Sequence, residues 1–573
     1  MMANRIVVDP IARIEGHLRV EAEVKDGKIA EAYSSGTSVR GIELILEGRD
    51  PRDVWAFTQR ICGVCTTTHA LCSVRAVEHA LDIKIPKNAN LIRNIMNEAQ
   101  FLHDHTVHFY HLHALDWVDV VSALDADPNE TSRIAQSISD WPNSSPGYFK
   151  DVQNKVKKVV ESGQLGIFAN GYWGHPLYKL PPEVNLLAVA HYLEALDWQK
   201  EFVKIHTILG GKNPHPHYVV GGMATPIDIN SDNAIHAERL MHISKIIDQA
   251  REFVNKVYIP DLLAIGSYYK DWLHGDSQKN YIVYGDFPTG DIRDVETYRA
   301  PRGIILDGDL SKVYDFDLAD KNQIQEFIDR SYYVYNDGKD SGGRHPSEGE
   351  TNLKYSGPNL PYDYLDVDKK YSWVKAPRWK NKPMETGPLA RVLVGYASGR
   401  EDYVETVNEA LQTLDVPVEA LHSAIGRMIA RGLETKIVAE WLRNDMDELL
   451  NNIKNGDQTT FDRSKWDPKT WPKNTSGIGW MEAPRGSLGH WTHIVDGKIH
   501  NYQAVVPTTW NASPADNNGN IGPLEASIKG TPIADPKRPL EILRIVHSYD
   551  PCLSCAVHLT DLENKETTKI MLG

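Results

Sequence analysis

The stretch DPCLSCAVH spans residues 550–558, almost at the end of the chain, and RICGVC spans residues 60–65 near its beginning. Each contains a Cys-x-x-Cys pair, a spacing that lets two thiolates point at one metal ion. Four of the five cysteines belong to these pairs, namely Cys62, Cys65, Cys552 and Cys555. If the fold brings both pairs together, four sulfur atoms surround one centre, and the rest of the chain builds the cavity around it.

Spacing alone leaves three kinds of site open: structural zinc, redox disulfides or a catalytic metal. A compact zinc ribbon is excluded, because nearly the whole chain separates the two pairs. A redox Cys-x-x-Cys usually opens a helix in a thioredoxin-like βαβ unit, and the sequence indicates no such unit. The fifth cysteine, Cys72, is expected to be a buried packing residue, since free cysteine is commonly buried.

Alternating apolar and charged residues predict two β hairpins near the pairs. Residues 18–25 alternate with period two, Asp26-Gly27 is a hairpin turn signal, and residues 29–33 can return. The same pattern recurs over 491–506, around the turn Asp496-Gly497. Each hairpin leads into or out of a sequence motif, so we expect both near the metal.

Long helices are predicted between the hairpins. Helical spacing of apolar residues follows Pro86, a second helix runs from Pro182 to Gly210, and two more cover 232–257 and 418–450. Gly426 and Gly432 in the last helix indicate a close helix contact. The sequence therefore predicts an α+β protein that is mainly α-helical, with a long-helix core, peripheral β hairpins, and N- and C-terminal segments meeting at a buried metal site.

The helix after Pro86 carries a cluster of ionisable side chains: His103, Asp104, His105, His108, His111 and His113. Asp104, His108 and His111 can share one face, which would allow a second metal site. The other interpretation, which we favour, is a buried polar network of hydrogen-bonded imidazoles.

Composition divides the chain into five segments that we expect to form one interlocked body, since its ends must meet. They are residues 1–85 (N-terminal hairpin and first pair), 86–260 (helical core), 261–390 (mixed β and loop region at the periphery), 391–558 (helical core, C-terminal hairpin and second pair) and 559–573 (C-terminal extension).

Charge and hydropathy exclude some function classes. The formal net charge over 573 residues is −15 and no basic cluster stands out, which argues against nucleic-acid binding. No apolar run approaches the ~18 residues that a membrane span needs. The N-terminus has no apolar signal segment, which read alone indicates the cytoplasm.

Seven stretches together carry a more specific signal. They are RIEGH (13–17), RGIE (40–43), RICGVCTTTHA (60–70), GIFANGY (166–172), EAPRG (482–486), VVPTTW (505–510) and DPCLSCAVH (550–558). In this order and spacing, the chain resembles over essentially its full length the large, catalytic subunit of nickel–iron hydrogenases. The likeness is greatest to the membrane-associated respiratory uptake type.

This resemblance implies a set of metal ligands. Cys65 and Cys555 would bridge nickel and iron, with Cys62 and Cys552 terminal on nickel, and the iron would carry one CO and two cyanides. The residues that match the pocket around these ligands are Pro484, Val506, Thr508 and His69. A separate site for magnesium, or a similar hard divalent cation, matches Glu43, the main-chain carbonyl of Ala504, and His558.

The implied reaction is the reversible heterolytic cleavage of H2 to protons and electrons, mainly in the uptake direction. Arg485 would lie over the metals, with Asp104 and Asp550 beside them. Either Cys552 or Arg485 would be the base. The alternative for Arg485 is a surface ion pair.

Glu15 matches the family glutamate that hydrogen-bonds the first cysteine of the C-terminal pair. Its carboxyl group suits a proton relay. The structural alternative is a salt bridge from Glu15 to Arg13 or Arg19.

Transfer of the electrons requires a partner, because the one cysteine outside the pairs, Cys72, is not enough to bind an iron–sulfur cluster. The resemblance implies an obligate heterodimer with an iron–sulfur small subunit, with a dimer of heterodimers as a further option, and a membrane quinone-reducing subunit reached through it. It also implies a peripheral position on the periplasmic side of the cell membrane, after export on the partner's twin-arginine signal; the alternative is the cytoplasm. A maturation endopeptidase would remove Leu559–Gly573 once nickel is loaded.

Two other function classes compete with a hydrogenase. One is a non-catalytic scaffold of the respiratory complex I type, whose members lack the four cysteines. The other is a zinc-stabilised structural protein.

Overall fold

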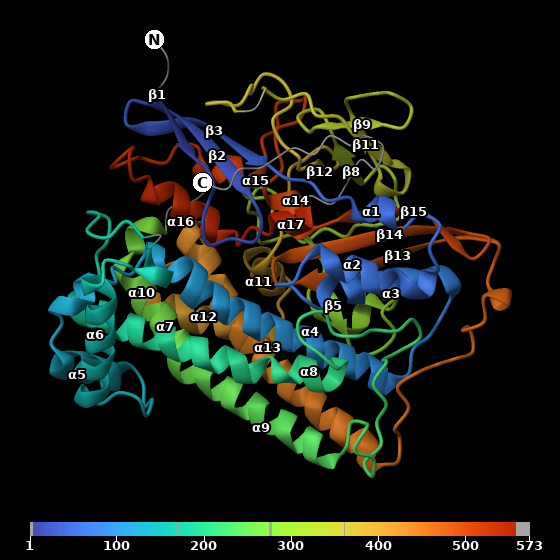
Figure 1. Ribbon diagram of the computed structural model, residues 1–573, viewed down its shortest axis with the longest axis horizontal. Coiled ribbons are helices and arrows are strands. Elements are labelled where there is room, and N and C mark those ends of the chain that lie inside the picture. Colours follow the sequence, from blue (N-terminus) through green and yellow to red (C-terminus); the bar gives the residue numbers. More distant parts are fainter. Residues whose placement is uncertain (1–3, 170, 274–277, 360, 557–573) are drawn as a thin grey trace.

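Four long helices form the largest layer of the fold (Figure 1). They are α4 (Lys87–Val107), α7 (Pro182–Phe202), α9 (Ala237–Phe253) and α13 (Ala424–Lys454). Helices α4 and α13 pack directly on each other. The computed structural model describes residues 4–169, 171–273, 278–359 and 361–556. Within those ranges, no helix combines the length and apolar character that crossing a membrane requires.

The remaining helices are shorter and connect or cover these four. They are α1 (Ile42–Ile45), α2 (Val54–Thr58), α3 (Thr68–Leu81), α5 (Pro128–Ile138), α6 (Pro146–Glu161), α8 (Lys204–Gly210), α10 (Ile259–Tyr268), α11 (Pro388–Ala397), α12 (Glu401–Leu414), α14 (Pro507–Asn511), α15 (Pro523–Ile528), α16 (Leu540–Ser548) and α17 (Leu553–Ala556).

The predicted helices all form, but some limits differ. The helix predicted over 232–257 begins at Ala237, because the amides of Asn233 and Ala234 donate to Ser231 in a turn that competes with helix. It then continues through a π turn, η7 (Val254–Tyr258), into α10. The helix predicted from residue 418 begins at Ala424, where the Ser423 side chain accepts the Gly426 amide as an N-cap.

The close helix contact predicted for α13 is confirmed at one of its two glycines. A Cβ added at Gly432 would lie 2.3 Å from Leu262 Cδ2 on α10. At Gly426, a Cβ would lie 2.0 Å from the carbonyl oxygen of Leu421, in the turn that precedes the same helix. Gly432 therefore serves helix packing, whereas Gly426 serves a local turn.

Both predicted hairpins form, and each gains a third strand. The N-terminal sheet consists of β1 (Asn4–Val8), β2 (Leu18–Lys25) and β3 (Lys28–Gly36), in that order. The C-terminal sheet consists of β13 (Asn474–Ala483), β14 (Gly486–Val495) and β15 (Lys498–Val505). All neighbouring strands are antiparallel.

Two glycines in β13 let helix α3 lie directly on the C-terminal sheet. A Cβ at Gly477 would lie 2.2 Å from the Ala76 oxygen, and one at Gly479 would lie 2.1 Å from the Cys72 oxygen. Helix α3 begins three residues after Cys65. The close approach therefore fixes the first Cys-x-x-Cys pair relative to the sheet.

The region predicted as peripheral β and loop contains only short strands. They are β4 (Tyr281–Val283), β5 (Asp286–Pro288), β6 (Tyr298–Ala300), β7 (Gly303–Ile305), β8 (Ile324–Phe327), β9 (Tyr333–Tyr335), β10 (Gly343–Arg344), β11 (Thr351–Leu353) and β12 (Ala376–Trp379). The expected segment limits at 260/261 and 390/391 fall inside α10 and α11. One continuous apolar core includes residues from both hairpins, the long helices and this region.

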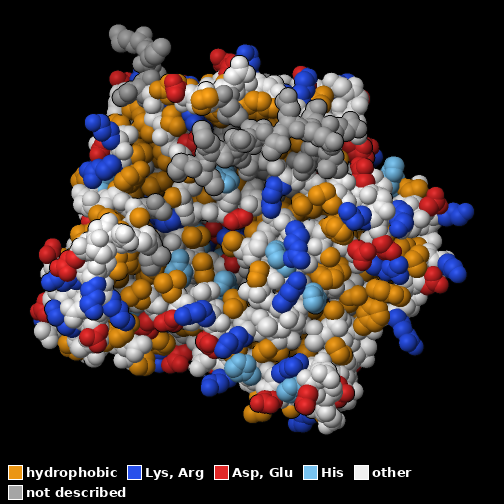
Figure 2. Space-filling view, in the orientation of Figure 1, with side chains coloured by type: hydrophobic (Ala, Val, Ile, Leu, Met, Phe, Trp, Pro, Cys, Tyr) orange, Lys and Arg blue, Asp and Glu red, His pale blue; other side chains and the backbone are white. Residues whose placement is uncertain are grey.

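Charged side chains of both signs are interspersed on the face shown in Figure 2, with small groups of hydrophobic residues between them. This face has no extended basic surface of the kind that nucleic-acid binding needs.

Adding a methyl group at Gly479 tests the contact between α3 and β13. Gly479→Ala should lower the free energy of unfolding by about 1–3 kcal/mol, because β13 has to move away from the backbone of α3. Thermal unfolding of the purified protein measures this as a lower Tm. The matched control is Gly147→Ala in α6, where a Cβ meets nothing within 4 Å. Equal Tm values for the two variants would contradict the packing account.

Candidate metal centre

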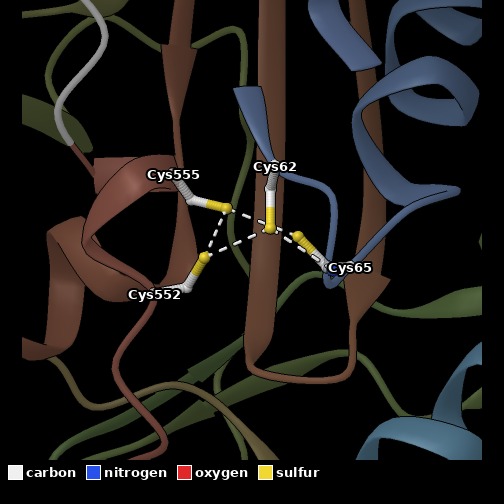
Figure 3. Close-up of side chains that lie close together, drawn as sticks. All are labelled: Cys62, Cys65, Cys552 and Cys555. Atoms are coloured by element: carbon white, nitrogen blue, oxygen red, sulfur yellow. Dashed lines mark hydrogen bonds between the residues drawn. The ribbon is translucent and has the colours of Figure 1, made fainter. Parts of the chain in front are cut away.

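Four buried cysteine side chains point toward one another between the two ends of the chain (Figure 3). The Sγ atoms of Cys62 and Cys552 lie 3.4 Å apart, as do those of Cys65 and Cys555, and those of Cys552 and Cys555 lie 2.9 Å apart. All four Sγ atoms lie within 4.8 Å of one another. We refer to these four residues as the four-thiolate cluster.

The geometry and chemistry of the cluster fit a metal. A metal–sulfur bond of about 2.3 Å allows two sulfurs on opposite sides of one ion to lie about 4.6 Å apart, close to the 4.8 Å limit of the cluster. The cysteines are free rather than in disulfides. Thiolates are soft ligands that select ions such as nickel, zinc and iron.

Protonation of the cluster is uneven in the protein alone. A hydrogen bond with Cys552 is the main cause that lowers the pKa of Cys62 well below its ordinary value. Burial raises the pKa of the Cys552 and Cys555 thiols well above theirs. Burial therefore disfavours ionisation of these thiols, and a bound cation would supply the charge that favours it.

Backbone contacts hold the C-terminal pair against the N-terminal segment. Glu15 and Cys552 form a parallel bridge, in which the Leu553 amide donates to the Glu15 oxygen at 2.7 Å. Gly16 has a φ of +83°, and a Cβ there would lie 2.7 Å from the Ser554 nitrogen. A side chain at position 16 would therefore push the two ends of the chain apart.

Arg40 joins both pairs from the exposed side of the cluster. Its guanidinium donates to the carbonyl oxygen of Ile61 and, at 2.7 Å, to that of Ser554. Arg40 belongs to the RGIE stretch, but no role was predicted for it. Its partners are backbone atoms, which a sequence pattern does not reveal.

Arg485 is a buried cation, so the surface ion pair considered from sequence is wrong. Only 4% of its surface is exposed. Nη1 donates to Asp104 Oδ2 at 2.9 Å, and Nη2 donates to Asp550 Oδ1 at 3.1 Å. Burial alone would lower the pKa of Arg485, but the charges of Asp550, Asp104 and the nearby Cys552 and Cys65 raise it well above its ordinary value.

The four residues predicted to surround the metal ligands lie close to the cluster. Thr508 Oγ1 accepts the Cys552 amide at 2.9 Å, and His69 Nε2 lies 3.4 Å from Cys555 Sγ. Pro484 is buried and directly precedes Arg485. Val506 is buried at the start of α14, which packs against α17. Burial lowers the pKa of His69 to about 4, which keeps its ring neutral.

Glu15 is half-buried beside the cluster. The salt bridge from Glu15 to Arg13 or Arg19, which the sequence analysis considered, does not form between these described residues. Arg13 pairs with Asp116 instead, and Arg19 pairs with Asp9 and Glu21. The role of Glu15 as a proton relay stays a prediction.

Two of the three predicted hard-cation ligands lie together. Glu43 Oε1 accepts the Ala504 amide at 2.7 Å, so the contact uses the nitrogen of Ala504 rather than its carbonyl. Burial is the main cause that raises the pKa of Glu43 to about 7. The third ligand, His558, lies outside the described residues.

The histidines after Pro86 form a buried polar network, as the favoured interpretation predicted. His105 Nε2 lies 2.9 Å from Glu434 Oε2, and His108 Nε2 lies 2.7 Å from the His547 oxygen. A π turn, η3 (His108–His113), follows α4 and ends the α-helical spacing on which a shared face depended. Across the described ranges, the four-thiolate cluster is the group of His, Cys, Asp and Glu side chains found to suit a metal.

Arg391, which the sequence analysis did not single out, binds the backbone just before Arg485. It is fully buried and binds Glu434 and Glu482. It also donates to the carbonyl oxygens of Ala483 at 3.0 Å and Pro484 at 2.8 Å. A single arginine in the apolar helix α11 is the signal that could have identified it, since a buried arginine requires such partners.

Comparisons of the sequence with known proteins also indicate a metal centre. Residues 40–558 match the family described as nickel-dependent hydrogenase. The chain is 56% identical to the uptake hydrogenase large subunit of Rhizobium leguminosarum bv. viciae, over 99% of this chain and 97% of that one. It is 50% identical to the Hydrogenase-1 large chain of Escherichia coli K12, with the same coverage.

Solved structures give the same result. A nickel–iron–selenium hydrogenase from Desulfomicrobium baculatum superimposes with a TM-score of 0.73 at 33% identity, over 97% of this chain and 99% of that chain. The nickel–iron–selenium hydrogenase of Desulfovibrio vulgaris Hildenborough gives a TM-score of 0.75 at 30% identity, over 97% of this chain and 100% of that one.

Replacing single sulfurs tests the four-thiolate cluster. Cys65→Ser and Cys555→Ser should each lose the bound metal, because a hydroxyl is a poor substitute for a soft thiolate ligand. Elemental analysis of the purified protein measures nickel and iron per chain. Cys72→Ser is the matched control, since Cys72 is fully buried and binds the Gly479 carbonyl outside the cluster. Normal nickel content in Cys555→Ser would contradict the assignment.

Proposed function

The chain belongs to the nickel-dependent hydrogenase family, and from this premise we propose how its residues serve the reaction. It is the catalytic large subunit of an enzyme that oxidises H2 at a nickel–iron centre. The observation that carries this function is the four-thiolate cluster with the buried Arg485 close to it. A complex I-type scaffold and a zinc-stabilised structural protein are not favoured, since the match to hydrogenases spans the whole chain and includes all four cysteines.

For the ligand set, we propose that Cys65 and Cys555 would hold both nickel and iron and that Cys62 and Cys552 would hold nickel alone. When bound, the metal centre supplies a Lewis acid that polarises H2 and accepts its electrons. CO and two cyanides on iron would occupy the pocket of Pro484, Val506 and Thr508. Because the Thr508 oxygen accepts the Cys552 amide, its hydroxyl hydrogen can still be donated to such a ligand.

The charges around Arg485 support Cys552 as the base. Two carboxylates raise the pKa of Arg485, so its guanidinium stays protonated and acts as a fixed positive charge and hydrogen-bond donor. The proton from H2 would then reside on Cys552 Sγ. Glu15 would take it from there, which the backbone bridge between Glu15 and Cys552 supports by holding both residues together.

An iron–sulfur small subunit would receive the electrons. The relatives are named as large subunits or large chains, which implies a small-subunit partner. We propose a heterodimer that passes electrons to a membrane quinone-reducing subunit and lies peripherally on the periplasmic side of the cell membrane. Magnesium, or a similar cation, would bind at Glu43, Ala504 and His558, which the buried Glu43 carboxyl supports.

We also propose that an endopeptidase removes residues 559–573 after nickel is loaded. These residues follow His558 directly and, like it, lie outside the described ranges. A new chain end at His558 would make this predicted ligand of the hard cation the terminal residue. Intact mass of the active purified subunit should correspond to a chain that ends at His558. An active subunit that retains Leu559–Gly573 would contradict this proposal.

Glu15→Gln tests the proton relay. The variant preserves the shape and hydrogen bonding of the side chain but removes its titratable proton. Metal content and the infrared bands of the iron ligands should stay unchanged, whereas H2 oxidation per nickel should fall by ~10²–10⁴-fold. Glu15→Asp should recover part of the activity. A Glu15→Gln enzyme with near-native turnover would eliminate Glu15 as the obligatory relay.

A further inference from the structure

A line of hydrogen bonds leads away from Cys555 into the C-terminal sheet. His69 Nε2 lies 3.4 Å from Cys555 Sγ, and His69 Nδ1 lies 3.2 Å from His490 Nε2. His490 Nδ1 in turn lies 2.5 Å from the Tyr502 hydroxyl oxygen. Each imidazole therefore uses both of its ring nitrogens within this line.

The three side chains come from different elements and are all buried. His69 belongs to α3, His490 to β14 and Tyr502 to β15, and their exposed fractions are 2%, 0% and 1%. His490 pairs with Ala504 and Tyr502 pairs with Thr492 in the sheet, so the two side chains are diagonal neighbours on adjacent strands. The contact between α3 and the sheet brings His69 to them.

The Cys555 sulfur, as a metal ligand, determines which atom donates in each of these hydrogen bonds. A thiolate bound to metal carries no hydrogen and only accepts. His69 then has to carry its hydrogen on Nε2 and accept at Nδ1. His490 has to donate from Nε2 and accept at Nδ1, so the Tyr502 hydroxyl donates to Nδ1.

We propose that His490 and Tyr502 are positioning residues that hold His69 as the Nε2–H tautomer, so that it donates a hydrogen bond to the Cys555 sulfur. This inference rests on the proposed function, in which Cys555 is a metal ligand. The three donors all point toward the sulfur, and donors in such a line polarise one another. The line therefore withdraws electron density from a ligand of the metal centre, as partners of metal-bound residues commonly do.

Infrared spectra of the purified complex test this inference, because the CO and cyanide bands report the electron density on iron. Tyr502→Phe removes the hydroxyl that donates to His490 Nδ1, together with its hydrogen bond to the Ser73 side chain. With less hydrogen bonding to Cys555, the sulfur gives more electron density to iron, which weakens the C–O bond. We expect the CO and cyanide bands to shift to lower frequency, with nickel and iron content unchanged.

Variants of His490 test the middle of the line. His490→Leu breaks it and should shift the bands at least as far as Tyr502→Phe does. His490→Gln can still accept through its oxygen and donate through its nitrogen, so its bands should return toward the wild-type positions. The matched control is Tyr403→Phe, which removes a fully buried hydroxyl that has no hydrogen-bond partner among the described residues. Its bands should coincide with those of the wild type.

Two results would overturn the inference. One is a Tyr502→Phe complex whose bands match the wild type, which would mean that Tyr502 does not act on the sulfur. The other is a Tyr502→Phe complex that loses its metals, which would assign the line to assembly instead. A wild-type complex without CO and cyanide bands would instead contradict the proposed function, so the two failures are distinguishable.

Discussion

The structure depends on bringing four sulfur atoms from opposite ends of the chain within 4.8 Å of one another. Four thiolates at that distance repel one another, and a bound cation relieves the repulsion. Contacts outside the sulfur atoms also hold the two ends of the chain together. Glu15 and Cys552 pair through their backbones, and Arg40 binds a carbonyl from each Cys-x-x-Cys stretch. Metal binding and closure of the fold are therefore coupled.

Close to the four-thiolate cluster, the protein buries the charged side chain of Arg485 away from water. Arg485 binds Asp104 and Asp550, and Arg391 holds the backbone just before it. Buried ion pairs of this kind contribute little net stability, because removing charges from water is costly. Their value is positional. They fix a protonated guanidinium close to the four-thiolate cluster.

The sequence predicted those structural features that show a regular spacing of apolar residues or contain a rare residue type such as cysteine. Both hairpins, the long helices and the cysteine pairs follow from such patterns. Strand β13 was missed because Gly477 and Gly479, which α3 requires for its close approach, lower the strand propensity. The π turn after α4 was missed because tertiary packing, rather than local spacing, decides it.

The same distinction applies to the site. Cys62, Arg485 and Thr508 belong to short stretches whose order in the chain identifies the family. Arg391, His490 and Tyr502 act through partners that are distant in sequence, such as Glu434 and His69. Only the fold shows those pairings. The sequence therefore predicted the residues that would contact the metals better than the residues that hold them in place.

X-ray absorption at the nickel edge of the purified complex tests the central claim most directly. The account predicts that nickel is present and that sulfur dominates its nearest shell, with iron close by. Those sulfurs come from both ends of the chain, so the signal should disappear when either Cys-x-x-Cys pair is replaced by serines. A nickel shell dominated by nitrogen or oxygen, or a shell that survives the loss of one pair, would contradict the account.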